Sequence, residues 1–301
     1  MARSKSHITS LDDRIVDTLV YVLGTLITVI AAYPLIFVLS ASFSEPSSVI
    51  TGKVVLWPVN FTVEGYKTIL EYAGIWTGYR NTIFYTLIGT TINICLTLPA
   101  AYALSRADFK ARGFFTAFFS FTMFFNGGLI PTYLVVKDLG LVNNPAVLVI
   151  LGAVSVWNMM ITRTFFQGSI PHSLEEAAYL DGCSTTRLFL QIVLPLSTPI
   201  IAVLVLFYAV GHWNNYFNAL IYLSKAEHYP LQLYLRNVLI LEDVSALMGD
   251  TEAVQEWLER LERKEAMKFG VVVVSSVPVL VLYPFLQKYF VKGMTIGAIK
   301  G

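Results

Sequence analysis

The sequence predicts an all-α, polytopic membrane protein with six transmembrane helices, because composition and apolar pattern both exclude an ordinary soluble domain. Of the 301 residues, 55% are hydrophobic and only 14% are charged, and the mean hydropathy is +0.64. A soluble domain of this length needs more charge to cover its surface. Long apolar blocks alternate with short polar ones, which is the pattern expected where lipid is the solvent.

Six segments reach the length of about 20 apolar residues that a helix needs to cross a bilayer. They are residues 15–42, 81–105, 114–136, 146–167, 198–222 and 270–290. Each is expected to be helical, because backbone in hydrocarbon must satisfy its hydrogen bonds within its own segment. The first is interpreted as a retained helix, since its apolar run is far longer than the core of about 7–15 residues in a cleaved signal peptide.

The distribution of basic residues predicts that both termini face the cytoplasm, because short segments rich in Lys and Arg lie on that side. In a six-span chain, the two ends and the second connection lie together, and they carry Arg3, Lys5, Arg14, Arg106, Lys110, Arg112, Lys288, Lys292 and Lys300. The fifth connection also carries bases, but it is long and glutamates match them. We therefore expect a cytoplasmic N-terminus of residues 1–14, a transmembrane domain of residues 15–291, a long external connection of residues 223–269 and a cytoplasmic tail of residues 292–301.

The connection between the fourth and fifth spans, residues 168–197, contains signals for a short helix. Ser173 and Glu176 have the spacing of a capping box, which predicts a helix that starts at Leu174. Gly182 is well placed to end this helix. A second helical piece is expected to follow the glycine.

This second piece is predicted to begin near Ser184 and to run towards Leu194, with Pro195 and Pro199 marking the turn into the fifth span. A capped helix at the mouth of two spans can act as a lever between a soluble partner and the membrane bundle. A well-capped loop without any partner is the alternative interpretation.

The same segment offers a contact surface. Ala177 and Ala178 have small side chains that allow another protein surface to approach closely. Glu176 and Asp181 offer negative charge to a basic partner.

The order of these residues resembles the EAA loop of binding-protein-dependent ABC importer permeases. The matching positions are Glu176, Ala177, Ala178, Gly182, Ile192, Leu194 and Pro195. In that family the loop forms a coupling helix that docks into a groove on the ATPase subunit. The resemblance therefore implies that Glu176, Ala177, Ala178 and Gly182 dock an ATPase here, within a coupling loop of residues 173–195 that also includes Asp181.

Other stretches are similar to the carbohydrate branch of that family, the maltose-type inner-membrane permeases. Residues 212–217, His-Trp-Asn-Asn-Tyr-Phe, resemble the signature of that branch. Residues 126–133 and 283–293 resemble a subgroup associated with uptake of complex oligo- and polysaccharides, including acidic polymers such as alginate. The resemblance covers nearly all of the chain except the charged stretch at residues 242–268.

The resemblance implies a non-catalytic permease subunit in the cell inner membrane, surrounded by lipid. The partners it implies are a second, similar permease subunit, a pair of ATPase subunits, an external solute-binding protein and an oligo- or polysaccharide substrate. ATP and Mg²⁺ would bind to the ATPase subunits, because this chain has no G-x-x-x-x-G-K-[ST] phosphate loop. The sequence shows no metal motif, and its formal net charge of +1 gives no basic field for nucleic acid.

Polar residues of the fifth predicted span are candidates for lining a solute path. Tyr208, His212, Asn215, Asn218 or Ala219, and Tyr222 recur at spacings of three or four, which places them on one face of a helix. Asn126 and Asn158 are further candidates in the third and fourth spans. Sugars bind through hydrogen bonds and ring stacking, and these side chains supply both. For each single residue, an interhelical hydrogen bond is the alternative.

Two other classes of protein fit less well. An ion-coupled secondary transporter needs intramembrane carboxylates, and no Asp or Glu lies in the central part of any predicted span. A membrane-embedded enzyme needs paired carboxylates, HExxH or a Ser/His/Asp arrangement within reach of water, and none is present. Residues 252–268 have helical apolar spacing, which is compatible with a helix that caps the bundle or with a docking surface for an external binding protein.

Overall fold

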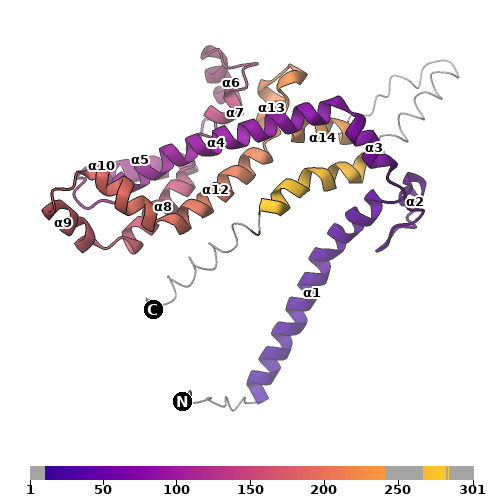
Figure 1. The fold of residues 1–301 in the computed structure, drawn as a ribbon, viewed down its shortest axis with the longest axis horizontal. Coiled ribbons are helices and arrows are strands. Elements are labelled where there is room, and N and C mark those ends of the chain that lie inside the picture. The colour runs from indigo at the N-terminus through magenta and orange to yellow at the C-terminus, as the bar shows by residue number, and fades with distance from the viewer. Residues whose placement is uncertain (1–10, 241–266, 283, 285–301) are drawn as a thin grey trace. The chain divides into compact units, whose positions relative to one another are not determined.

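The computed structural model describes residues 11–240, 267–282 and 284, and these residues are mainly helical (Figure 1). The β pairing within them is limited to an isolated antiparallel bridge between Ser44 and Phe61. The predicted tail, most of the predicted N-terminus and most of the predicted helix at residues 252–268 lie outside the described residues.

The chain divides into two compact units. Among the described residues, the first unit contains residues 11–71 and 267–274, and the second contains residues 72–240, 275–282 and 284.

The first unit contains a long apolar helix followed by a folded connection. Its helices are α1 (Leu11–Ser42), α2 (Pro46–Ile50) and α3 (Glu64–Glu71). After α1, the Asn60 side-chain amide donates to Glu45 Oε2 at 2.7 Å, and Tyr66 OH donates to Ser42 Oγ at 2.8 Å. Side chains therefore hold this connection in a defined shape.

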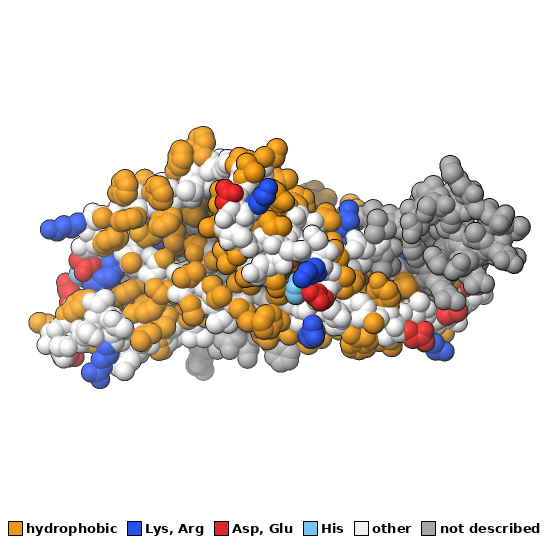
Figure 2. Space-filling view, turned by 90° about the horizontal axis from the view of Figure 1, so that it is seen from above, with side chains coloured by type: hydrophobic (Ala, Val, Ile, Leu, Met, Phe, Trp, Pro, Cys, Tyr) orange, Lys and Arg blue, Asp and Glu red, His pale blue; other side chains and the backbone are white. Residues whose placement is uncertain are grey.

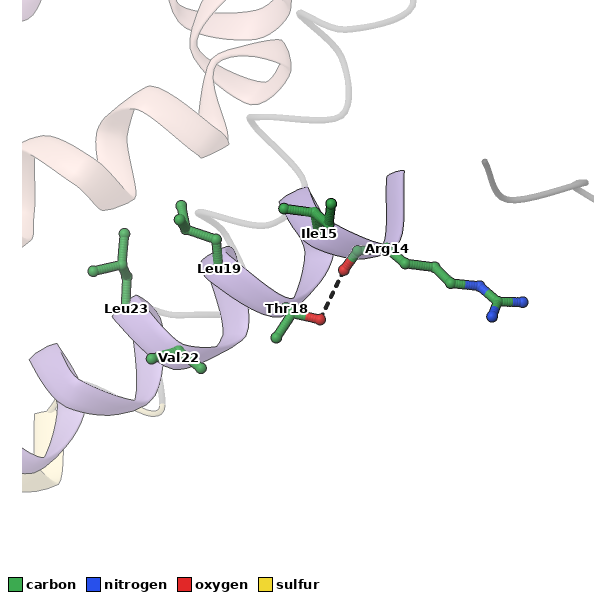
Figure 3. Close-up of a pocket in the computed structure, with 6 residues that line it drawn as sticks. All are labelled: Arg14, Ile15, Thr18, Leu19, Val22 and Leu23. Atoms are coloured by element: carbon green, nitrogen blue, oxygen red, sulfur yellow. Dashed lines mark hydrogen bonds between the residues drawn. The ribbon is translucent and has the colours of Figure 1, made fainter. Parts of the chain in front are cut away.

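The surface of α1 suits lipid or another membrane helix. Figure 3 shows Ile15, Leu19 and Leu23 on one side of the helix, with Arg14 extending away at its N-terminal end. The Thr18 hydroxyl donates to the carbonyl of Arg14 at 2.7 Å, so it offers no free donor to a solute. The hollow beside these residues is therefore an apolar surface. We assign it to the membrane, because α1 is long and apolar enough to cross a bilayer.

The second unit is built around one long helix, α4 (Ala73–Ser105). The elements that follow are α5 (Arg112–Phe124), α6 (Leu129–Asp138), α7 (Val147–Ile150), α8 (Val156–Ser169), α9 (His172–Leu180), α10 (Thr185–Leu188), the π-helix η1 (Phe189–Val193), α11 (Leu194–Leu196), α12 (Thr198–Trp213), α13 (Phe217–Tyr222), the 3₁₀ turn η2 (Ala226–His228) and α14 (Leu231–Ile240). Helices α12, α8 and α14 pack along α4, as Figure 1 shows.

Two helices of the described residues, α1 and α4, are long and apolar enough to cross a membrane. The number rises to four if each of two sharply bent helix pairs is counted as one span. Helix α4 contains the predicted span at residues 81–105 and begins eight residues earlier, at Ala73. The helix that corresponds to the predicted span at residues 270–290 begins at Met267, and the structure describes it as far as Leu282.

The prediction of one continuous helix at residues 114–136 was wrong. Helices α5 and α6 are bent by 113° at this point. The break occurs at Asn126-Gly127-Gly128, where Asn126 Oδ1 accepts a hydrogen bond from the Gly128 N–H at 2.9 Å. Gly128 has a φ of +81°, a conformation that an ordinary helix cannot contain.

Two further predicted spans are also interrupted. In residues 146–167, α7 ends at Ile150 and α8 begins at Val156, with the Ser155 side chain capping the new helix by accepting from Asn158 N at 3.3 Å. In residues 198–222, α12 ends at Trp213 and α13 begins at Phe217. The predictions of continuous helices over these two segments were therefore wrong.

Large apolar side chains cover much of the exterior. Seen from above in Figure 2, hydrophobic side chains spread over the face and charged ones are few. Helix α5 alone exposes Phe114, Phe118, Phe121 and Phe124. Because soluble monomers rarely expose large continuous apolar patches, this surface indicates contact with lipid or with partner membrane helices.

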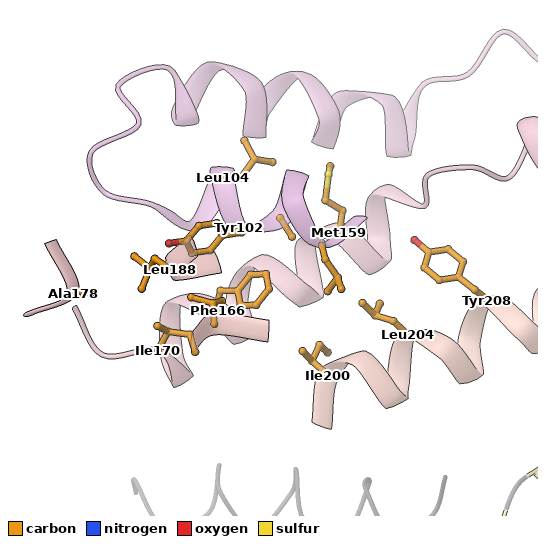
Figure 4. Close-up of a cluster of buried hydrophobic side chains, with 13 residues drawn as sticks. Tyr102, Leu104, Met159, Phe166, Ile170, Ala178, Leu188, Ile200, Leu204 and Tyr208 are labelled. Carbon is orange, nitrogen blue, oxygen red and sulfur yellow. The ribbon is translucent and has the colours of Figure 1, made fainter. Parts of the chain in front are cut away.

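The hydrophobic core of the second unit joins α4 to the segments that come after it (Figure 4). Its buried residues are Leu98, Ala101, Tyr102, Leu104, Met159, Phe166, Ile170, Ala178, Leu188, Val193, Ile200, Leu204 and Tyr208. They come from α4, α8, α9, α10, η1 and α12 and from Ile170 between α8 and α9. This cluster therefore links the connection at residues 168–197 to the long helix.

Polar side chains bind the same elements together above this core. Asn93 Oδ1 of α4 accepts a hydrogen bond from His212 Nε2 at 2.7 Å, and Asn93 Nδ2 donates to the carbonyls of Gly152 and Ala153. The Thr97 and Tyr208 hydroxyls lie 2.7 Å apart. These bonds tie α4 to α12 and to the break between α7 and α8.

Gly89 allows α4 and α12 to approach this closely. A Cβ added at Gly89 would collide with the imidazole ring of His212. We expect Gly89→Ala to lower the free energy of unfolding by about 1–3 kcal/mol, the usual cost of overpacking a core. Thermal unfolding of the detergent-solubilised chain measures this loss.

Gly113→Ala is the matched control, because a Cβ at that position meets nothing within 4 Å. Equal unfolding temperatures for the two variants would contradict the close approach of α4 and α12.

Candidate coupling site and solute path

Helix α9 lies between α8 and α10 at one end of the second unit (Figure 1). It begins at His172, two residues before the predicted start, and the predicted capping box of Ser173 and Glu176 was wrong. Pro171, with φ fixed at −65°, precedes the first turn, so Ser173 lies inside the helix instead of before it. Glu176 Oε1 instead lies 3.1 Å from His172 Nδ1, one turn away.

The predicted end of this helix at Gly182 was confirmed. Gly182 has a φ of +74°, and its N–H donates to the carbonyl of Tyr179 at 3.0 Å. The N–H of Cys183 donates to the carbonyl of Ala178 at 2.9 Å. Together these two bonds form a Schellman motif, which satisfies the last carbonyls of α9 and turns the chain sharply.

The second helical piece was also confirmed. The Ser184 hydroxyl accepts from Arg187 N at 3.3 Å and so caps α10. The chain then continues through η1 and α11 and bends by 81° before α12, at the position marked by Pro195 and Pro199. The whole connection is therefore made of capped helical pieces joined to α12.

The two faces of α9 have different surroundings. Ala178 is 7% exposed and packs in the hydrophobic core, and Glu175 lies beside it on the same side. Glu176, Ala177 and Leu180 lie on the opposite face, where the exposed fraction of Leu180 reaches 89%. Small, acidic and apolar side chains thus lie next to one another on a face that the described part of the chain leaves uncovered.

The remaining residues of the EAA-like pattern divide in the same way. Asp181 and Gly182 are exposed at the end of α9, and Pro195 is exposed in α11. Ile192 and Leu194 are half-buried and pack against the core. The pattern therefore mixes residues that hold the loop in place with residues that stay accessible.

Arg106, just after α4, anchors α9 from the other side. Its Nε and Nη2 donate to the Asp108 carboxylate at 2.8 and 2.7 Å, and its Nη1 donates to Tyr102 OH at 2.9 Å. Nη1 also lies 3.2 Å from Glu175 Oε1. The hydrogen bond from Arg106 lowers the pKa of Asp108 below its ordinary value, so the carboxylate keeps its charge beside the guanidinium at neutral pH.

Sequence reasoning missed this contact. It used Arg106 only as one of several bases that set the orientation, and it selected Glu176 instead of the adjacent Glu175. Arg106 and Glu175 lie far apart in the chain, and no local spacing connects them.

Several candidates for the solute path are buried within this chain. Tyr208 and His212 face Thr97 and Asn93 in the interhelical hydrogen bonds described above. Tyr222 is 2% exposed and stacks on Tyr133 at 5.9 Å between ring centroids, and Asn158 is 7% exposed at the start of α8.

The other candidates are more accessible. Asn126 is exposed at the break between α5 and α6, and Asn215 and Asn218 are partly exposed near the break between α12 and α13. The single helical face predicted through residues 208–222 was wrong, because the helix is interrupted after Trp213. Asn214 was not among the predicted path residues. Its Nδ2 donates a hydrogen bond to the carbonyl of Val210 at 3.0 Å.

The sequence matches a known protein family along most of its length. The family described as "Binding-protein-dependent transport system inner membrane component" matches residues 72–296. The chain is 39% identical to the polygalacturonan/rhamnogalacturonan transport system permease protein YtcP of Bacillus subtilis, over 96% of this chain and 99% of that one. It is also 39% identical to protein LplC of Bacillus subtilis, over 90% of each chain.

A solved structure extends this similarity to three dimensions. It is a bacterial ABC transporter involved in the import of the acidic polysaccharide alginate, and one of its chains is 35% identical to this one. The TM-score is 0.82, and the match covers 93% of this chain and 98% of that chain. The chain therefore belongs to the family of binding-protein-dependent transport system inner membrane components, as the loop at residues 173–195 predicted.

Proposed function

We propose that this chain is a permease subunit of an ATP-driven importer for an oligosaccharide or polysaccharide, in the cell inner membrane with both termini in the cytoplasm. The named substrates of two similar proteins, polygalacturonan and rhamnogalacturonan in one case and alginate in the other, support this substrate class. Galacturonan and alginate chains both carry carboxylates, so an acidic saccharide is the substrate we favour.

The uncovered face of α9 is the observation on which this proposal chiefly rests. Glu176, Ala177 and Leu180 form a small, accessible surface, whereas Ala178 anchors the same helix to the core. A helix held on one side and free on the other suits docking of a soluble partner. We assign that partner as a pair of ATPase subunits, which would bind ATP and Mg²⁺, while this chain performs no catalysis.

The geometry of the loop explains how such docking would move the membrane segments. The Schellman motif at Gly182 and the Ser184 cap leave little free chain between α9 and α12. A displacement of α9 would therefore be carried through the 81° bend into α12. A second permease subunit would complete the path, and an external binding protein would deliver the solute, so that ATP-driven closure switches the bundle between two states.

The solute path is proposed to run along the accessible amides near the helix breaks. Asn126, Asn215 and Asn218 are candidates for hydrogen bonds to sugar hydroxyls. Tyr208, His212, Tyr222 and Asn158 would support this surface from behind, because they are buried within the chain.

A bulky side chain on the uncovered face tests the docking proposal. We expect Ala177→Trp to weaken ATPase binding by about tenfold or more, the scale of losing an interface hot spot, because the added ring blocks close approach. Co-purification of the ATPase subunits and import into reconstituted vesicles measure the effect.

Ala226→Trp, at another exposed alanine, in η2, is the matched control. Normal ATPase binding and import by Ala177→Trp would refute docking at α9.

The path proposal predicts that two polar residues of one region behave differently. Asn215→Ala is expected to reduce import severalfold while leaving the thermal stability of the assembled complex unchanged. His212→Ala is expected to lower that stability, because it leaves the buried side-chain oxygen of Asn93 without its partner, at a cost of about 1–3 kcal/mol.

Import assays combined with thermal unfolding distinguish the two effects. Unchanged import by both Asn215→Ala and Asn218→Ala would remove this region from the solute path.

A further inference from the structure

We propose that Arg106 is a positioning residue that locks α9 to the end of α4, so that a displacement of α9 also moves α4. This inference rests on the proposed function, because it assumes that an ATPase subunit acts on α9. It adds a second route of transmission beside the covalent route from α9 through α10 and α11 into α12.

Arg106 lies where α4 ends, and its side chain is only 10% exposed. A charge that is withdrawn from water has to be compensated by partners. Asp108 occupies Nε and Nη2 as a two-pronged partner, which leaves Nη1 directed at Tyr102 OH and Glu175 Oε1. Asp108 therefore orients the guanidinium, and the remaining edge reaches α9.

Glu175 is the matching group on α9. Its side chain is 13% exposed, and it accepts a hydrogen bond from Tyr102 OH at 3.3 Å in addition to its ion pair with Arg106. The adjacent Glu176 is 66% exposed and pairs with His172 of its own helix. Two neighbouring carboxylates thus take different directions: Glu175 binds the end of α4, and Glu176 stays on the uncovered face.

Aromatic rings from both helices enclose the same guanidinium. The Cζ of Arg106 lies 5.6 Å from the ring centroid of Tyr102 in α4 and 5.4 Å from that of Tyr179 in α9. Both distances are within the range of cation–π attraction. Arginine suits this place better than lysine, because its flat fork binds a carboxylate on one edge while its faces contact rings.

The apolar contact between the buried residue of α9 and the core is small. The Ala178 side chain is one methyl group, and dispersion contacts of this kind have little directionality. Charge-assisted hydrogen bonds, in contrast, fix the orientation of the groups they join. Since α4 also holds α12 through Asn93 and Thr97, a movement passed to α4 would reach the centre of the unit.

The test uses the complete importer reconstituted in lipid vesicles, with its partner permease, ATPase subunits and binding protein. The quantity measured is solute imported per ATP hydrolysed, in Arg106→Met, Glu175→Gln, the double variant and Arg106→Lys. Arg187→Met is the matched control, because Arg187 Nε donates to Gln191 one turn away within the same connection.

We expect each single variant to keep its ATPase subunits but to lose about fivefold in solute imported per ATP, a change on the scale of couplings between distant sites. The double variant should be no worse than either single one, because both remove the same contact. Arg106→Lys should retain part of the coupling, and Arg187→Met should match the unmodified importer. Arg106→Lys and Glu175→Gln keep the approximate size and the polarity of the original side chains. They therefore still test the inference if Arg106→Met fails to fold.

Three results would overturn the inference. The first is an unchanged ratio of solute imported to ATP hydrolysed in both single variants. The second is a loss in the double variant that equals the product of the two single losses. The third is loss of ATPase binding in Glu175→Gln and Arg106→Lys, because that result would assign the pair to docking. A different failure, absence of ATP-dependent import by the unmodified complex, would refute the proposed function itself.

Discussion

The hydrogen bonds that Asn93 makes from the middle of α4 hold together α4, α12 and the break between α7 and α8, and the packing of the second unit depends on these contacts. A bilayer core has no water to satisfy polar groups, so irregular backbone at that depth needs protein partners. Asn93 supplies them to the carbonyls of Gly152 and Ala153, and its other side-chain atom meets His212 of α12. One amide thereby permits a break between α7 and α8 and fixes α12 beside it.

The same principle operates along the rest of α4. Towards its N-terminal end, Asn81 Nδ2 donates to the carbonyls of Glu227 and Tyr229 at 2.7 and 3.1 Å. The Thr82 hydroxyl accepts from Leu231 N at 2.8 Å and so supports the start of α14. Towards its C-terminal end, Tyr102 and Arg106 contact α9. Helix α4 therefore connects the region around η2 and α14 to the connection that contains α9, with the Asn93 contacts between them.

This arrangement has a functional consequence. The breaks bring accessible amides such as Asn126 and Asn215 into an otherwise apolar bundle, whereas the buried polar residues keep the helices in register. A transporter needs both properties, since the solute has to meet polar groups while the bundle moves between states as defined bodies. In the mechanism we propose, α9 receives the force and α4 and α12 carry it.

Sequence reasoning succeeded where the cause lies within a few residues. The end of α9 followed from Gly182, and the start of α10 from Ser184, because capping groups act on the nearest turn. It failed at the start of α9, where Pro171 shifts the first turn. The break at Asn126-Gly127-Gly128 was signalled by turn-forming residues, but an average of hydropathy over 20 residues conceals such a short interruption.

The sequence by itself determined that the chain is a helical membrane protein of the importer family and where its EAA-like loop lies, because solvent preference and capping are local properties of side chains. Only the tertiary structure decided which polar residues are buried and with whom they pair. His212 meets Asn93, and Glu175 instead of Glu176 meets Arg106, because partners far apart in the chain are selected by how the helices pack.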